Sequence, residues 1–122
     1  MTTQYTPVYL PAERLSDVTS ATVTGGQLLY SQATVAPTTA ATSAWVGVAA
    51  ADAASGDRVT YYTEGVHDLA SSGTINAGDL VIPAASGAVA AIGTVTTANS
   101  VQVVGVAKSA AASGKVRVLL RP

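Results

Sequence analysis

The chain has 122 residues and no cysteine, which predicts one domain and excludes disulfides, cysteine-based zinc sites and a thiol nucleophile. Charged residues make up 11% of the sequence, against about 25% in an ordinary soluble domain. The net charge of −1, with no block of lysine or arginine, argues against nucleic acid as a partner. A surface with so few charges is either rich in serine and threonine or covered by partners, and we expect both.

Residues 1–17 differ from the rest of the chain and are expected to form an extended N-terminal arm. Proline fixes φ and favours extended geometry in the preceding residue, and this segment carries two prolines. Its apolar residues fit docking on a partner as well as they fit a frayed terminus. The start of the chain lacks the basic and apolar regions of a signal peptide. The candidate contact residues in the arm are Tyr5, Pro7, Val8, Tyr9, Leu10 and Pro11.

Residues 18–122 are expected to form an all-β domain, a small barrel or sandwich. Threonine, valine and alanine dominate, and glycine-containing groups separate short runs at fairly even intervals. Two stretches without charge, Val18–Ala51 and Leu80–Ala107, are interrupted every few residues by polar residues or glycine, so neither is read as a membrane helix. The expected strands are Ala21–Thr24, Leu28–Ser31, Thr34–Ala36, Ala44–Ala49, Arg58–Thr63, Val66–Leu69, Leu80–Ile82, Val89–Ile92, Val101–Ala107 and Val116–Leu120.

A repeated segment divides this domain into two related β-units. Residues 46–56, which run from Val-Gly-Val to Ala-Ser-Gly, match residues 104–114 at eight of eleven positions with an offset of 58. Upstream, residues 26–30 resemble residues 78–82 at an offset of 52, so the second copy carries six extra residues (58 − 52). Each copy takes a valine-rich strand through a tight loop into a returning strand. The predicted structural turn glycines are Gly47, Gly56, Gly105 and Gly114.

Alternation in the last strand predicts which of its side chains are buried. The core face should carry Val116, Val118 and Leu120, and the outer face Lys115, Arg117 and Arg121. Of these, Arg117 and Arg121 are candidates for contact with acidic groups on a neighbouring molecule. The alternative is that they are solvated charges that protect an edge strand from aggregation.

Four motifs in a fixed order carry a resemblance to a known family. They are Gly26–Leu29, Tyr62–Leu69, Ala77–Val81, and Val104–Ala107 with Ala112–Val118. This order resembles the capsid cement (decoration) proteins of tailed phages, over about residues 18–120. Some members of that family carry a label as RecA/RadA-like recombinases. The resemblance implies a β-barrel-like fold, a homotrimer, and binding to the major capsid protein on the capsid exterior after synthesis in the host cytoplasm.

No catalytic, metal-binding or cofactor-binding residues are predicted. A nucleotide-binding P-loop needs two glycines followed by Lys and Ser or Thr, but Val116 follows Gly114-Lys115 and Ser109 stands where the first glycine should be. The only histidine, His67, lies near Glu64 and Asp68, but residues 64 and 67 of a strand point to opposite faces. We therefore expect a surface histidine and no cofactor.

With no catalytic residues found, the resemblance implies a non-enzymatic virion protein that binds the outer surface of an assembled capsid and stabilises it. Two alternatives are kept. The first is a β-rich virion surface or fibre-base module that binds a host or a glycan. The second is a small hydrolase-like enzyme, which would require His67 to lie in a pocket beside serine and aspartate.

Overall fold

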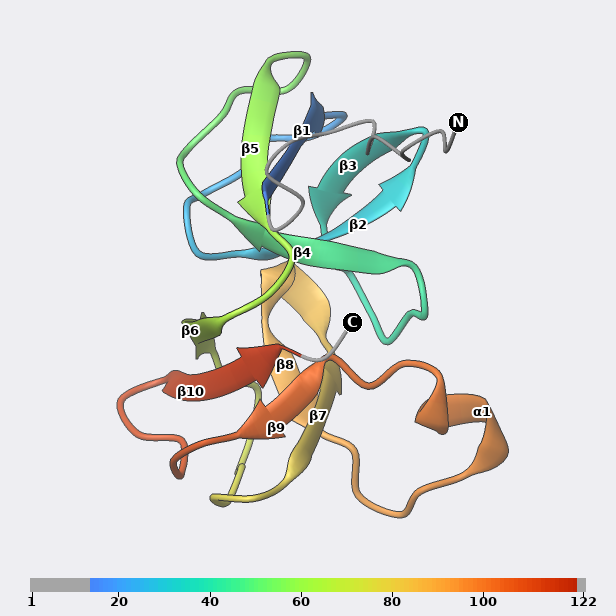
Figure 1. Cartoon of the computed structure of the whole chain (residues 1–122), viewed down its shortest axis with the longest axis vertical. Helices are drawn as coiled ribbons and strands as arrows, with labels where there is room; N and C mark the ends of the chain where they lie inside the picture. Colours follow the sequence, from blue (N-terminus) through green and yellow to red (C-terminus); the bar gives the residue numbers. More distant parts are fainter. Residues whose placement is uncertain (1–13, 121–122) are drawn as a thin grey trace, which may run out of the picture.

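The chain forms two five-stranded antiparallel sheets, one from each half, in a computed structural model that describes residues 14–120 (Figure 1). The first sheet has the strand order β1-β5-β4-β2-β3, and the second has the order β6-β10-β9-β7-β8. The strands of the first sheet are β1 (Arg14–Val18), β2 (Leu28–Gln32), β3 (Thr34–Pro37), β4 (Trp45–Ala49) and β5 (Arg58–Tyr62). Those of the second are β6 (Val66–Ala70), β7 (Leu80–Pro83), β8 (Val89–Ala91), β9 (Gly105–Ala107) and β10 (Lys115–Leu120).

The two sheets have the same topology, because β1 to β5 correspond in order to β6 to β10. In each sheet a single parallel bridge brings the two edge strands together, Thr19 with Val35 and Ser71 with Val89. Each sheet otherwise stays open, so the units form two separate sheets and do not close one barrel between them (Figure 1). The predicted all-β class and the two related β-units are confirmed.

The duplication extends to single backbone hydrogen bonds. In each unit, one bond joins the turn before the second strand to the end of the fourth strand. Another bond joins the segment before that turn to the loop between the fourth and fifth strands. The first pair is Gly26 N–H to Ala49 O and Gly78 N–H to Ala107 O, each 2.8 Å. The second pair is Ala53 N–H to Val23 O and Ala111 N–H to Ile75 O, each 2.9 Å. The repeat is therefore present in the structure as well as in the sequence.

The six extra residues of the second unit lie in two loops. Val35 corresponds to Val89 at an offset of 54, which places two of the residues (54 − 52) between β7 and β8. That connection contains a short 3-10 turn, η1 (Ala85–Gly87). The other four (58 − 54) lie between β8 and β9, in a loop that contains the short helix α1 (Thr97–Ser100).

Two expected strands differ from the observed ones. In the stretch Val101–Ala107 only the last three residues form a strand, because Thr96 caps α1 with a capping box to Asn99 and the chain turns through residues 101–104. The stretch Ala21–Thr24 makes one isolated bridge, between Val23 and Ala53, and no regular strand. The first segment is held by the local hydrogen bonds of its capping box. The second is held by its one bridge and by a bond of 2.7 Å from Thr24 N–H to Gln27 Oε1.

The core consists of two clusters, and β2 faces both of them. Leu29 lies in the interior of the first unit, whereas its neighbour Leu28 points to the other face of the sheet and packs with the second unit. Val48, the cross-strand partner of Leu28, packs there too. The first cluster comprises Val23, Leu29, Val35, Ala49, Val59 and Tyr61. The second comprises Leu28, Val48, Leu69, Ile75, Val81, Val89, Val104, Ala107, Val116, Val118 and Leu120.

Hydrogen bonds between η1 and the first unit strengthen this apolar contact. The Thr38 hydroxyl donates to Ala84 O at 2.8 Å, and Gly87 N–H donates to Thr38 O at 2.9 Å. Gln27 Nε2 donates to Ser86 O at 3.2 Å. Two of the extra residues of the second unit therefore serve to hold the first one.

The last strand has the predicted alternation. Val116, Val118 and Leu120 are buried, and Lys115 and Arg117 are exposed. Arg121 lies outside the described residues.

The repeat glycines do two different things. Gly47 and Gly105 lie in the strands β4 and β9, so the prediction that they are turn glycines is wrong. Glycine is needed at both positions because an added Cβ would collide with a carbonyl oxygen of the neighbouring strand. Gly56 and Gly114 lie in turns and have φ of 91° and 74°.

The Ala-Ser-Gly turns of the two units have different geometries. In the second unit Ser113 also has a positive φ, 54°, and Ala112 and Lys115 bond each other in both directions, as in a type I′ hairpin. In the first unit only Gly56 has a positive φ, because Asp57 adds one residue before β5. Identical residues therefore adopt two turn types.

This difference predicts that the same substitution has unequal effects in the two turns. Asparagine tolerates positive φ better than serine, so Ser113→Asn should raise the free energy of unfolding by about 0.5–1 kcal/mol. Ser55→Asn, at the corresponding position of the first unit, should change it by less than about 0.5 kcal/mol. Urea unfolding of both variants and the wild type measures this, and equal effects would contradict the assignment of two turn types.

Candidate interaction surfaces

The predicted contact residues of the arm, from Tyr5 to Pro11, lie outside the described residues. Residues 14–17, which the sequence pattern placed in the arm, belong instead to β1 and pair with β5. Leu15 packs against the first cluster, and Asp17 accepts a hydrogen bond of 2.6 Å from the Tyr61 hydroxyl. These contacts make residues 14–17 part of the first sheet.

Arg117 pairs with an acidic residue of its own chain. Its Nε donates to Asp68 Oδ1 at 3.1 Å, across the pair of strands β10 and β6. Both side chains are about 60% exposed (61% and 60%), so solvent screens the pair. The sequence pattern could not identify Asp68 as the partner, because 49 residues separate the two in the chain. The exposed pair remains available to a neighbouring molecule.

His67 is partly buried near the start of β6, where the chain passes from the first unit to the second. Its Nε2 is 2.9 Å from Glu64 O, and its ring stacks on Tyr62 with centroids 5.5 Å apart. Contacts with a backbone carbonyl and a tyrosine ring do not provide the nucleophile and carboxylate of a hydrolytic triad. Within residues 14–120 no group of three or more histidine, aspartate or glutamate side chains is placed to hold a metal ion.

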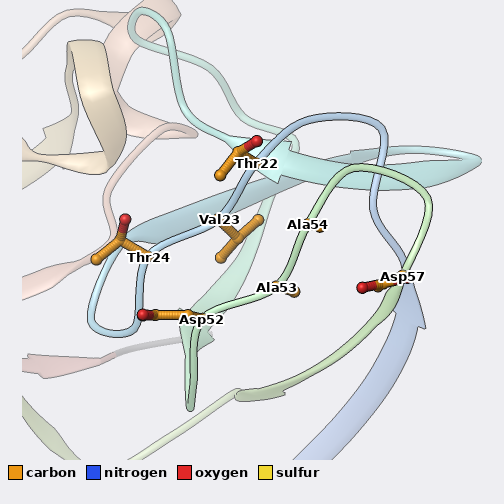
Figure 2. Close-up of a pocket in the computed structure, with 7 residues that line it drawn as sticks. All are labelled: Thr22, Val23, Thr24, Asp52, Ala53, Ala54 and Asp57. Atoms are coloured by element: carbon orange, nitrogen blue, oxygen red, sulfur yellow. The ribbon is translucent and has the colours of Figure 1, made fainter.

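An open recess in the first unit carries two carboxylates (Figure 2). Asp52 and Asp57 lie at opposite ends of it and do not converge. Asp52 already accepts a hydrogen bond of 2.8 Å from Gly25 N–H, which holds the turn before β2. The recess is lined by Thr22, Val23, Thr24, Asp52, Ala53, Ala54 and Asp57. Asp52 therefore stabilises the loop, and the arrangement lacks the convergent polar groups of a ligand site.

Exposed valines are a surface feature that the strand pattern missed. The exposed large hydrophobic residues among those described are Val18, Val66, Val95 and Val101. Val95 and Val101 are the most exposed, at 57% and 66%, and both lie in the longer loop of the second unit. The available signal was the offset change from 52 to 58, which marks an insertion inside a stretch without charge.

A family model for phage cement proteins matches residues 11–122. The chain belongs to the phage cement protein family. The cement protein is therefore a phage structural protein associated with the capsid and the virion, as the resemblance of its sequence motifs implied. The match also includes Pro11, the last of the predicted contact residues in the arm.

One solved structure supports the fold of the cement protein independently. The N base of the head fiber protein gp8.5 of bacteriophage phi29 has a TM-score of 0.63 and 22% sequence identity to it. The alignment covers 88% of this chain and 92% of that chain. The similarity shows that the two share the paired-sheet architecture. No curated protein matches the sequence.

In the part of the cement protein from residue 14 to residue 120, no helix has the length and apolar character needed to cross a membrane.

The Arg117–Asp68 pair should contribute little to stability. Exposed ion pairs typically couple by about 0.2–1 kcal/mol, so Arg117→Ala should lower the free energy of unfolding by no more than about 1 kcal/mol. A double-mutant cycle with Asp68→Ala, read by urea unfolding, measures the coupling. A coupling of several kcal/mol would mean that the pair is a structural element and would remove Arg117 from the candidate contact residues.

Proposed function

We propose that this cement protein binds the outer surface of an assembled phage capsid and stabilises the shell against internal pressure. The family match over residues 11–122 supports this proposal most strongly. The architecture fits a structural role, since two small sheets with shallow surface recesses provide surface for contact and no convergent catalytic groups in the described residues. The major capsid protein is the proposed partner, and the protein acts without a cofactor.

Sparse charge supports an extensive contact surface. Only 11% of the residues are charged, and the stretch from Leu80 to Ala107 contains no Asp, Glu, Lys or Arg. Charged residues are depleted at the centres of protein interfaces. Many copies on one shell, each a proposed homotrimer, would reinforce one another through multivalency. Weak single contacts are then sufficient for stable decoration.

The arm is the proposed capsid contact, with Tyr5, Pro7, Val8, Tyr9, Leu10 and Pro11 as its contact residues. Extended apolar segments can add a strand to an exposed sheet edge of a partner. Arg117 and Arg121 are proposed as a second contact, in which arginine meets acidic groups of a neighbour.

A head-fibre base is a second candidate function, favoured by one observation. The solved structure of similar fold is described as the N base of a head fiber. In this alternative the protein would sit on the virion surface and serve as a base for binding a host or a glycan.

Binding to undecorated shells tests the proposed function. Purified protein mixed with shells that lack it should appear as added density on the shell exterior in cryo-electron microscopy. Decorated shells should also withstand a higher temperature than bare shells before they release their contents. Absence of added density at saturating protein would contradict the proposal, and decoration without a gain in thermal resistance would leave only the fibre-base candidate.

Deletion of residues 1–12 tests the role of the arm. The variant keeps β1, so its circular dichroism spectrum and its unfolding midpoint should match those of the wild type. Its binding to shells should weaken by about 10-fold or more, because each 1.4 kcal/mol of lost contact is a factor of ten. Arg117→Ala in the full chain is the comparison for the second contact. Unchanged binding would show that the arm is not the main contact, and loss of folding would make it part of the core.

A further inference from the structure

The two units differ in how well one pair of equivalent residues is covered. Leu28 on β2 and Val48 on β4 are direct cross-strand partners, with exposed fractions of 0% and 2%. Their counterparts, Leu80 on β7 and Val106 on β9, are partners in the same register but are only partly buried. The second unit covers the pair in the first unit, and nothing in the described chain covers the second pair as fully.

The contact between the units explains why one face is left over. Leu28 and Val48 pack with Leu69, Val104 and Leu120 of the second unit, among others, and not with Leu80 or Val106. Different surfaces of two related units therefore meet, which is a heterologous contact. Such a contact always leaves one copy of each surface unused at the ends of the pair. One of the two unused copies here is the face around Leu80 and Val106.

We propose that this face is the surface through which copies of the chain associate. We call it the open face, and it comprises Leu80, Ile92, Val95 and Val106. We include Val101, which is exposed on the loop that also carries Val95. Leu80, Ile92 and Val95 line one recess together, and Ile92 N–H donates to Leu80 O at 2.9 Å. Asp79 also lines this recess, where its carboxylate accepts a hydrogen bond of 2.9 Å from Asn76 N–H. The loop that carries Val95 and Val101 projects beside β7 and β9, at the end of the molecule away from the first sheet (Figure 1).

The chemistry of the open face suits an apolar partner. All five of its residues are aliphatic, and none of the residues from 80 to 107 is charged. At the position of Thr38, whose hydroxyl bonds η1 in the first unit, the second unit has Ile92. The substitution removes a polar group from the face. Contact through it would therefore depend on apolar burial and respond little to salt.

A second copy of this chain fits the open face better than a capsid protein does. Permanent interfaces between identical subunits are more apolar than interfaces that form between separately stable partners. A decorating protein must exist free in water before it meets a shell, and an aliphatic face exposed for that time favours aggregation. Association between copies covers it from the start. Heterologous contacts of this kind close into a ring, and this inference rests on the homotrimer of the proposed function.

Lysine substitutions on the open face test the inference. Val95 and Val101 are 57% and 66% exposed, so the double variant V95K/V101K should fold normally by circular dichroism. Wild type should sediment as one oligomer, and V95K/V101K as a monomer at the same concentration. The matched control is V66K, because Val66 is 50% exposed on an edge strand of the same unit and should keep the oligomer. A milder pair, V95S/V101S, should raise the dissociation constant of the oligomer at least about 10-fold.

The outcomes separate this inference from the proposed function. A wild type that is monomeric at all concentrations, or a V95K/V101K variant that stays oligomeric, would overturn the inference. If that variant stays oligomeric but no longer decorates shells, the open face binds the capsid instead. A wild type that is oligomeric through this face but does not bind shells leaves the inference standing and defeats the proposed function.

Discussion

The contact that buries Leu28 and Val48 against the second unit is the constraint on which the rest of the structure depends. A five-stranded sheet of this length has two faces, and the interior of the first unit covers only one of them. The other face carries aliphatic residues that must be removed from water. The second unit provides the cover, through its own larger cluster and through η1. Neither half of the chain buries all of its apolar surface alone.

In each unit the backbones of the fourth and fifth strands approach each other closely at one glycine. Gly47 and Gly105 occupy corresponding sites in the two sheets, where a side chain would strike a carbonyl oxygen of the neighbouring strand. The two glycines therefore allow the fourth and fifth strands of each unit to approach each other closely. The second unit keeps this device and adds residues only in loops, where insertions disturb pairing least.

The added loops give the two units different tasks. One short insertion, at η1, joins the units, and the other, around α1, carries the most exposed valines. The duplicated fold has in this way acquired an internal interface, and the open face is the proposed external one. A domain of this size needs the internal interface for its stability, and the proposed association would use the external one.

The sequence by itself determined the all-β class and nearly all of the strands, because alternating valines and glycines at turns are local patterns. It also determined the duplication, because the two copies keep matching residues at a nearly constant offset. It also indicated the family through the order of its motifs. It did not predict β1, because prolines and charged residues near Arg14 are not typical of a strand. This short strand pairs with β5, which begins 40 residues after β1 ends (58 − 18). Nor did the sequence separate Leu28 from Leu80, which have similar neighbours in the sequence. Only the tertiary structure decided that one is buried and the other partly open, because burial depends on which surfaces of the two units meet.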